Sequence, residues 1–367
     1  MNYLRVLLAF LTLQTTACAS RSGDYERELD RARALERKGQ LEPSSSAYGR
    51  AASLAKTPED HVEALYRQAQ AYRRAHEFSQ AIKLLEDLAG SYPESSRAPR
   101  ALLDKGRILE RMGHPKRAAQ VYTRLIKRYP TAPVASSAVT ALGRLQTENR
   151  SAAFRQMLEQ TPPGELEQLL RLRLGQALAE EGAIPQAIST LERLARDYPL
   201  PRSGYSDEAL LLSASLRRKE GDAQGCVAVL ESLVSQDTRA DIVGSYVRAS
   251  YPQGLWLMAE VLRDDLANPA EAEKAFLRLA AQYPDSLLAD DALWQAGALA
   301  LSRDDEKAAC QRAQQLKARR PTSRYASCLS YLCPNEEPAP AQPRCTSALH
   351  DLPDRHRPRA QKSDSPE

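Results

Sequence analysis

The segment KRAAQVYTRLIKRYP, residues 116–130, decides the fold, because its pattern returns along the chain. It places a small residue, Ala118, twelve positions before a closing proline, Pro130. Between them Tyr122 and Leu125 lie on one helical face, which predicts an amphipathic α-helix that ends before the proline. Four further segments align on the same alanine and proline: SQAIKLLEDLAGSYP (79–93), PQAISTLERLARDYP (185–199), AEAEKAFLRLAAQYP (270–284) and KAACQRAQQLKARRP (307–321).

A second helical pattern precedes each of these segments. We call the first helix of each pair A and the second B. Breakers such as Gly113-His114-Pro115 separate the two. A small residue in helix A and the alanine in helix B predict that the two helices approach closely. The small A-helix residues are Ala69, Gly106, Gly175 and Gly297.

This unit resembles the tetratricopeptide repeat, most clearly in residues 62–93 and 99–130. The resemblance implies an all-α fold, a right-handed helical solenoid of about eight helix pairs over residues 24–327. In one degenerate pair Cys226 takes the place of the small B-helix alanine, which favours a buried, inert thiol. The degenerate pairs are residues 24–57, 134–163 and 206–237.

The chain opens with MNYLRVLLAFLTLQTTACAS, an apolar run too short to span a bilayer but typical of an export signal. Thr15 to Cys18 resemble a bacterial lipobox, which implies a signal peptide over residues 1–17, lipid on Cys18 and a linker over residues 18–23. Ala19 after the cysteine implies the outer membrane, with the protein facing the periplasm. The alternatives are a soluble periplasmic protein cut after Ala19 and an uncleaved anchor.

Five cysteines follow Cys18, and four of them lie close together in an exported, oxidising context. These candidate disulfide cysteines are Cys310, Cys328, Cys333 and Cys345. The spacing leaves two pairings open. In one, Cys328 bonds to Cys333. In the other, Cys310 bonds to Cys328 and Cys345 is left to pair with Cys333. Residues 328–367 are rich in proline and poor in large apolar side chains, which predicts a disordered tail.

Composition and motifs argue against catalysis and cofactors. The net charge of +4 on 367 residues does not by itself indicate nucleic-acid binding. No nucleophile-elbow, phosphate-loop or zinc-protease motif is present, and acidic pairs such as Asp304-Asp305 suit helix caps. Cys333, Cys345, His350 and His356 lack the short spacing that structural zinc prefers. We therefore expect no enzyme, metal or cofactor.

In tetratricopeptide arrays the A helices line a concave groove. The resemblance therefore implies that a set of residues of this chain lies in such a groove. The arginines suit carboxylate or phosphate ligands, or form an ordinary solvated face. The aromatic residues suit binding anchors, or packing between repeats. The groove residues are Tyr66, Arg73, Arg74, Arg100, Arg107, Arg111, Arg144, Trp256 and Trp294.

Two junctions, YPESSRAPRA (92–101) and YPDSLLADDA (283–292), resemble those of BamD- and YbgF-like envelope proteins. This resemblance implies a non-enzymatic outer-membrane lipoprotein that scaffolds protein partners in a cell-envelope complex. The alternative function is binding of an anionic small molecule, glycan fragment or lipid head group through Arg100, Arg107 and Arg111. Expected partners are envelope proteins and, through Cys18, the membrane, but not nucleic acid.

Overall fold

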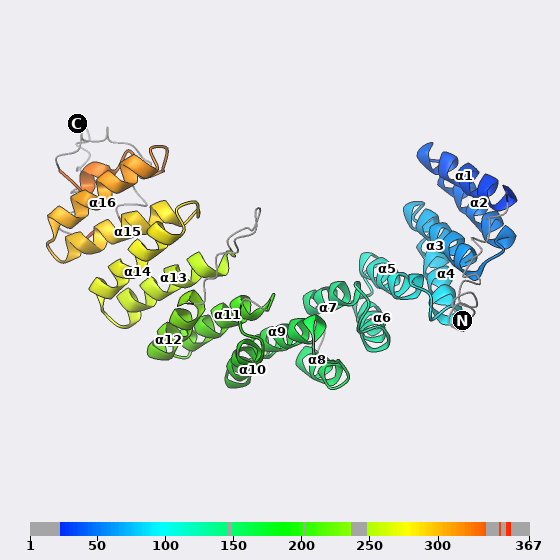
Figure 1. Ribbon diagram of the computed structural model, residues 1–367, viewed down its shortest axis with the longest axis horizontal. Coiled ribbons are helices and arrows are strands. Elements are labelled where there is room, and N and C mark those ends of the chain that lie inside the picture. The colour runs from blue at the N-terminus through cyan, green and yellow to red at the C-terminus, as the bar shows by residue number, and fades with distance from the viewer. Residues whose placement is uncertain are drawn as a thin grey trace, which may run out of the picture. The chain divides into compact units, whose positions relative to one another are not determined.

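The computed structural model describes residues 23–145, 149–200, 203–235, 248–334, 345 and 350–353. Over these residues the protein is all-helical, with sixteen α-helices and no strand (Figure 1). The chain divides into two compact units, Met1–Asn149 and Arg150–Glu367. The predicted all-α helical-repeat fold is confirmed. The predicted signal peptide and Cys18 lie outside the described residues.

The first unit contains three complete helix pairs and the A helix of a fourth. Successive helices pack against each other, and the A helices α3, α5 and α7 also contact one another in turn. Its helices are α1 (Gly23–Arg37), α2 (Leu41–Leu54), α3 (Pro58–Arg74), α4 (Phe78–Ser91), α5 (Arg97–Arg111), α6 (Pro115–Arg128) and α7 (Ala135–Arg144).

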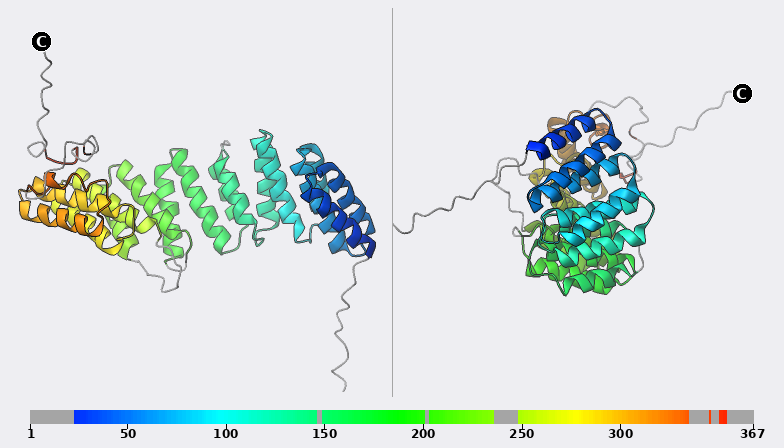
Figure 2. Two further views of the ribbon diagram at one scale, coloured as in Figure 1. Left: turned by 90° about the horizontal axis from the view of Figure 1, so that it is seen from above. Right: turned by 90° about the vertical axis from the view of Figure 1, so that its right-hand side faces the viewer.

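The second unit continues the pattern from the short helix α8 (Figure 2). Its A helix α13 ends in one π-helical stretch, and a 3-10 turn follows the last pair. Its elements are α8 (Arg150–Leu158), α9 (Glu165–Glu180), α10 (Ile184–Asp197), α11 (Ser206–Lys219), α12 (Ala223–Ser235), α13 (Ser250–Glu260), η1 (Val261–Asp265), α14 (Pro269–Gln282), α15 (Ala289–Ser302), α16 (Glu306–Arg319) and η2 (Leu329–Tyr331). Within the described residues no helix is both long and apolar enough to cross a membrane.

Each turn from helix A to helix B contains one residue with a left-handed backbone. Glycine holds this position in some turns, as at Gly113 with φ of 76°, because it has no Cβ to clash. His76 holds it at φ 62° and Asp304 at φ 63°. The glycines that the sequence indicated as breakers therefore follow the A helices, and other residues, Ala267 among them, hold this position elsewhere.

The predicted close approach of helices A and B is confirmed at the glycines. A Cβ added at Gly106 would overlap the ring of Tyr122, and one at Gly175 would overlap Leu191. Tyr122 and Leu191 each lie four residues after a fully buried B-helix alanine. The B-helix alanines, Ala81, Ala118, Ala187, Ala272 and Ala309, are all completely buried, as is Cys226 in the equivalent position.

Side chains also cap the starts of helices and form ion pairs between neighbouring helices. The Asp305 carboxylate accepts from the backbone N–H of Ala308 at 2.9 Å, which confirms the predicted helix cap. Glu86 on α4 pairs with Arg124 of α6 at 2.6 Å and with Lys105 of α5. The Arg124 hydrogen bond and the Lys105 ammonium lower the pKa of Glu86 to about 2, against its burial. One carboxylate thus joins three helices of the first unit.

The predicted disordered tail is wrong for its described residues. Leu329 and Leu332 are buried, as are Cys345 and Leu352, and all of them belong to the hydrophobic core formed with α13 to α16. The sequence suggested disorder because prolines and charges dominate the composition of this segment. A few apolar side chains and two disulfides hold the described residues in place.

Candidate functional site

Most of the predicted groove residues come together on the A helices of the first unit. Tyr66, Arg73 and Arg74 lie on α3, which contacts α5, and α5 in turn contacts α7. We call the exposed sides of α3, α5 and α7 the A-helix face. The α5 and α7 members are Arg100, Arg107, Arg111 and Arg144.

A buried carboxylate, Asp104, organises the middle of this face. It accepts a hydrogen bond from the Tyr66 hydroxyl at 2.5 Å and from the Gln70 amide at 2.8 Å. Arg100 and Arg107 each approach its oxygens to 3.9 Å while about half of each arginine side chain remains exposed. Burial, followed by the bond to Asp104, raises the pKa of Tyr66 to about 12. Tyr66 is therefore a positioned part of the fold rather than an exposed anchor.

The two α3 arginines are already engaged within the protein. Arg73 donates from Nε to the Gln70 side chain at 2.9 Å. Arg74 forms an ion pair with Glu36 of α1. These contacts hold the two side chains along the repeat surface and leave less of their hydrogen-bonding capacity for a ligand.

Three other arginines remain more available. Arg107 and Arg144, from adjacent A helices, both act electrostatically on the Tyr122 hydroxyl. Burial and then Glu110, which accepts from that hydroxyl, outweigh the two arginines and raise the Tyr122 pKa. Neither Arg111 nor Arg144 forms an ion pair with another described residue, and both are exposed. We call Arg107, Arg111 and Arg144 the arginine cluster.

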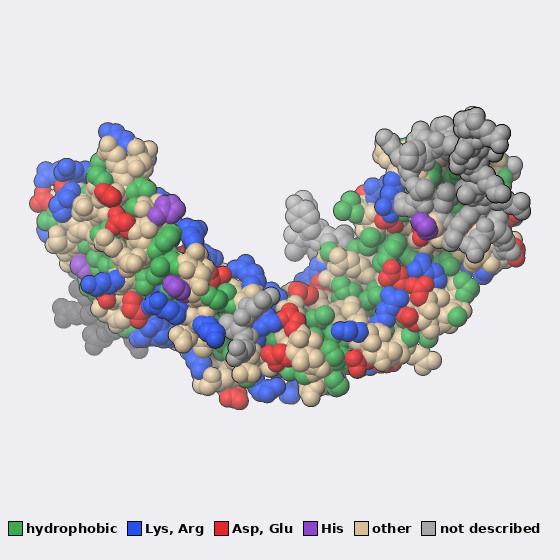
Figure 3. Space-filling model, turned by 180° about the vertical axis from the view of Figure 1, so that it is seen from behind, with side chains coloured by type: hydrophobic (Ala, Val, Ile, Leu, Met, Phe, Trp, Pro, Cys, Tyr) green, Lys and Arg blue, Asp and Glu red, His purple; other side chains and the backbone are tan. Residues whose placement is uncertain are grey.

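On the face drawn in Figure 3, lysine and arginine side chains alternate with hydrophobic and acidic ones. This mixture is what an ordinary solvated helical face would give. What sets Arg111 and Arg144 apart is that neither has an acidic partner among the described residues.

A cavity of about 820 Å³ also opens on the first unit, and the sequence did not predict it. It lies between α1, the start of α3 and the loop that joins α4 to α5. Glu63 on its wall is paired with both Arg67, at 2.7 Å, and Arg97, at 2.6 Å. The guanidinium of Arg97 also lies over the Tyr66 ring, 4.9 Å from its centroid. The only sequence signal was the junction 92–101, which supplies part of the lining.

The two tryptophans of the second unit do not play equivalent roles. Trp294 is completely buried and stacks on Tyr325 at 4.8 Å, so its prediction as a groove anchor is wrong. Trp256 is half-buried, packs edge-on against Phe276 at 5.0 Å and donates to Glu260 at 2.9 Å. Trp256 therefore packs within its own helix pair, α13 with α14, and Trp294 packs against the segment after α16.

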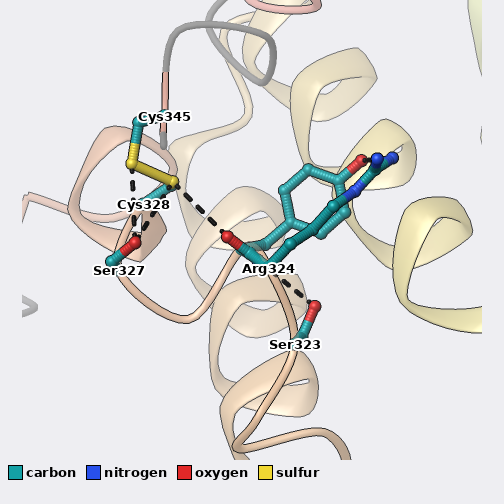
Figure 4. Close-up of a disulfide and its surroundings, with 6 residues drawn as sticks. Ser323, Arg324, Ser327, Cys328 and Cys345 are labelled. Atoms are coloured by element: carbon teal, nitrogen blue, oxygen red, sulfur yellow. Dashed lines mark hydrogen bonds between the residues drawn. A yellow bond between two sulfur atoms is a disulfide. The ribbon is translucent and has the colours of Figure 1, made fainter. Parts of the chain in front are cut away.

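The four candidate disulfide cysteines are all oxidised, but the suggested pairings are wrong. Cys310 bonds to Cys333 and Cys328 bonds to Cys345. In Figure 4 the Ser327 hydroxyl lies beside the second disulfide, 3.7 Å from each sulfur. Spacing alone could not choose this connectivity, because the turn after α16 brings the later cysteines back to the helix. Cys226 is buried and free, as predicted.

Candidate chemical groups do not converge elsewhere in the described part of the chain. No set of three His, Cys, Asp or Glu side chains there is placed to hold a metal ion. His350 is exposed, and His356 lies outside the described residues. Asp264 and Asp265 are both paired with Arg218 across the end of α13. Their role in the described structure is to fix neighbouring repeats.

Sequence profiles described as tetratricopeptide repeat match most of the array. One matches residues 29–96, 66–133 and 103–165, and a second matches residues 170–200 and 253–286. Together they cover more than half of the chain. No curated protein is similar enough in sequence to count as a match.

Solved structures with similar helical repeats share little sequence with this chain. A Naa15/Naa10 structure bound to HypK-THB is 17% identical, with a TM-score of 0.43 over 89% of this chain and 46% of that chain. This chain thus spans less than half of that protein's length. The C-terminal part of a TPR repeat-containing protein from Cytophaga hutchinsonii is 11% identical, with a TM-score of 0.45 over 72% and 98%. A tetratricopeptide repeat protein from Parabacteroides merdae is 13% identical, with a TM-score of 0.35 over 74% and 98%.

Proposed function

This chain belongs to the tetratricopeptide-repeat family, and from that premise we propose that it is a non-enzymatic scaffold whose A-helix face binds an acidic segment of a partner protein. The observation that carries the proposal is the arginine cluster. Its side chains come from two adjacent A helices, are exposed, and lack full acidic partners among the described residues.

Charge and geometry favour an extended acidic segment as the occupant. Arginine offers paired donors that match a carboxylate, and such charge-assisted bonds are stronger than neutral ones. Arg107 and Arg111 lie one turn apart on α5, while Arg144 comes from the end of α7. A partner that places carboxylates along the A-helix face would meet all three, whereas a single small anion would meet fewer.

Charge reversal tests this surface. We expect Arg107→Glu with Arg144→Glu to weaken binding of the native partner at least tenfold, roughly 1.4 kcal/mol, because like charges then meet across the contact. The matched control is Arg117→Glu, an exposed arginine on the B helix α6. A photoreactive residue at position 107, read by mass spectrometry, identifies the partner. If the double variant and the control bound the partner equally, the A-helix face would not be the binding surface. If the photoreactive residue captured only glycan or lipid, the ligand would be an anionic molecule of that kind and not a protein.

We further propose that the scaffold is held at the outer membrane, facing the periplasm, by lipid on Cys18. The support is the lipobox-like stretch Thr15 to Cys18 after an export signal, followed by Ala19. Several acyl chains would anchor the protein stably. The partner would then belong to a cell-envelope complex.

Intact mass of the protein from membranes tests the anchor. We expect a mature chain that starts at Cys18 and carries diacylglycerol and a further acyl chain. Cys18→Ala should move the protein out of the membrane fraction. A wild-type chain that is cut after Ala19 and carries no lipid would instead establish a soluble periplasmic protein.

A further inference from the structure

The last helix pair lacks a side chain that other pairs supply from their own B helix. In α6 and α10 the residue four positions after the buried alanine, Tyr122 or Leu191, lies against the A-helix glycine. In α16 the equivalent residue is Ala313, which is too small to reach. Ala313 is nevertheless completely buried, so another group fills the space beside it.

That group comes from the segment after α16. A Cβ at Gly297 of α15 would meet Leu332 at 2.7 Å, and Leu332 itself is completely buried. Leu332 therefore contacts the A-helix glycine as Tyr122 does in the third pair. The alanine at position 313 and the leucine at position 332 are complementary, which explains why the last B helix departs from the repeat pattern.

Covalent bonds fix this inserted leucine. Cys333, the next residue, is bonded to Cys310, which follows the buried alanine of α16. The second disulfide joins Cys328, four residues before Leu332, to Cys345, so Leu332 lies inside the loop that it closes. We call residues 325–334, Cys345 and residues 350–353 the strap.

The strap covers α15 on the side where an array would otherwise expose an apolar end. Nearly all of α15 is buried, including Trp294, which stacks on Tyr325 of the strap. Leu352 is also buried in this core, and Asp351 acts electrostatically on Arg263 at the end of α13. Repeat arrays need such terminal capping to stay soluble.

We propose that the strap is a thiol-controlled cap of the last helix pair. With both disulfides intact, Leu332 fills the space left by Ala313. A dithiol reductant transfers two electrons and two protons to each disulfide, leaving two cysteine thiols on the chain while its own sulfurs form a disulfide. Reduction removes the chain restraint on the strap, so Leu332 leaves and the apolar surface of α15 and α16 opens.

Hydrogen exchange of the full chain, with and without dithiothreitol, tests thiol control. We expect backbone amides of α15 and α16 to exchange roughly 5- to 30-fold faster after reduction, because their local opening becomes easier. Helices α9 and α10 of the same unit, whose buried residues lie outside the core cluster that includes the strap, should keep their rates. Unchanged exchange in α15 and α16, with all four thiols shown to be alkylated, would overturn the proposal.

Exchanging the two complementary side chains tests the packing without reduction. Leu332→Ala should speed amide exchange in α15 and α16 as reduction does. Adding Ala313→Leu should slow it again, because α16 then supplies the missing side chain. The matched control is Leu287→Ala, because Leu287 is 91% exposed on the preceding loop. If α15 and α16 exchanged as fast in the double variant as in Leu332→Ala alone, the role assigned to Leu332 would be contradicted.

Discussion

Replacing Gly106 with leucine is expected to lower the unfolding free energy of the first unit by about 3 kcal/mol, at the upper end of overpacking costs. Even a Cβ at this position would overlap the Tyr122 ring, which is completely buried and has no free space to enter. Helices α5 and α6 must then separate. The Tyr122 hydroxyl would also move from Glu110, its hydrogen-bond acceptor. Chemical denaturation followed by circular dichroism measures the change.

Gly90→Leu is the matched control for this prediction. Gly90 lies within α4, is exposed, and has no neighbouring atom where a Cβ would be placed. Leucine there should stabilise the helix by up to about 1 kcal/mol, because glycine is a poor helix former. If Gly106→Leu and Gly90→Leu had the same effect, the close packing of helices A and B would not be the basis of the repeat.

The second large effect is expected at Asp104. Asp104→Ala should destabilise the first unit by about 3 kcal/mol, since hydrogen bonds to a charged group contribute roughly 1.5–3 kcal/mol each. The variant leaves the buried Tyr66 hydroxyl without its acceptor and releases Gln70. It also frees Arg100 and Arg107 from the carboxylate that lies between them. The same denaturation experiment measures the loss.

Asp104→Asn separates hydrogen bonding from charge. The amide oxygen can still accept from Tyr66, so we expect a loss of only about 1 kcal/mol. A double-mutant cycle with Tyr66→Phe should give a coupling free energy of roughly 1.5 kcal/mol or more, because the two groups are in direct contact. Additive effects in that cycle would show that the bond contributes nothing to stability.

The sequence predicted the helix pairs well because their signals are local. The buried alanine, the apolar stripe and the closing proline lie within a single helix, and glycine marks many of the turns. The fourth pair, residues 134–163, was recognised as degenerate, and its helices α7 and α8 have only 10 and 9 residues. Capping by Asp305 was predicted for the same reason, since the cap and the N–H that it binds are three residues apart.

The candidate site was predicted only in part, because its properties depend on contacts between repeats. The sequence placed Arg74 and Arg107 in one set, yet Arg74 is paired with Glu36 while Arg107 is only loosely held by Asp104. Trp294 and Trp256 occupy similar repeat positions, but only Trp294 is completely covered. Neither difference can be predicted from the spacing of residues within one helix.

The sequence by itself determined an all-helical repeat protein and the likeness to tetratricopeptide repeats, because short-range periodicity specifies each helix and its partner. The tertiary structure alone decided which arginines stay without an acidic partner, which cysteines bond, and that Leu332 packs against Gly297. Those outcomes depend on side chains that approach from separate helices and from the segment after α16. Their meeting is set by the packing of the whole array and not by the spacing within any one helix.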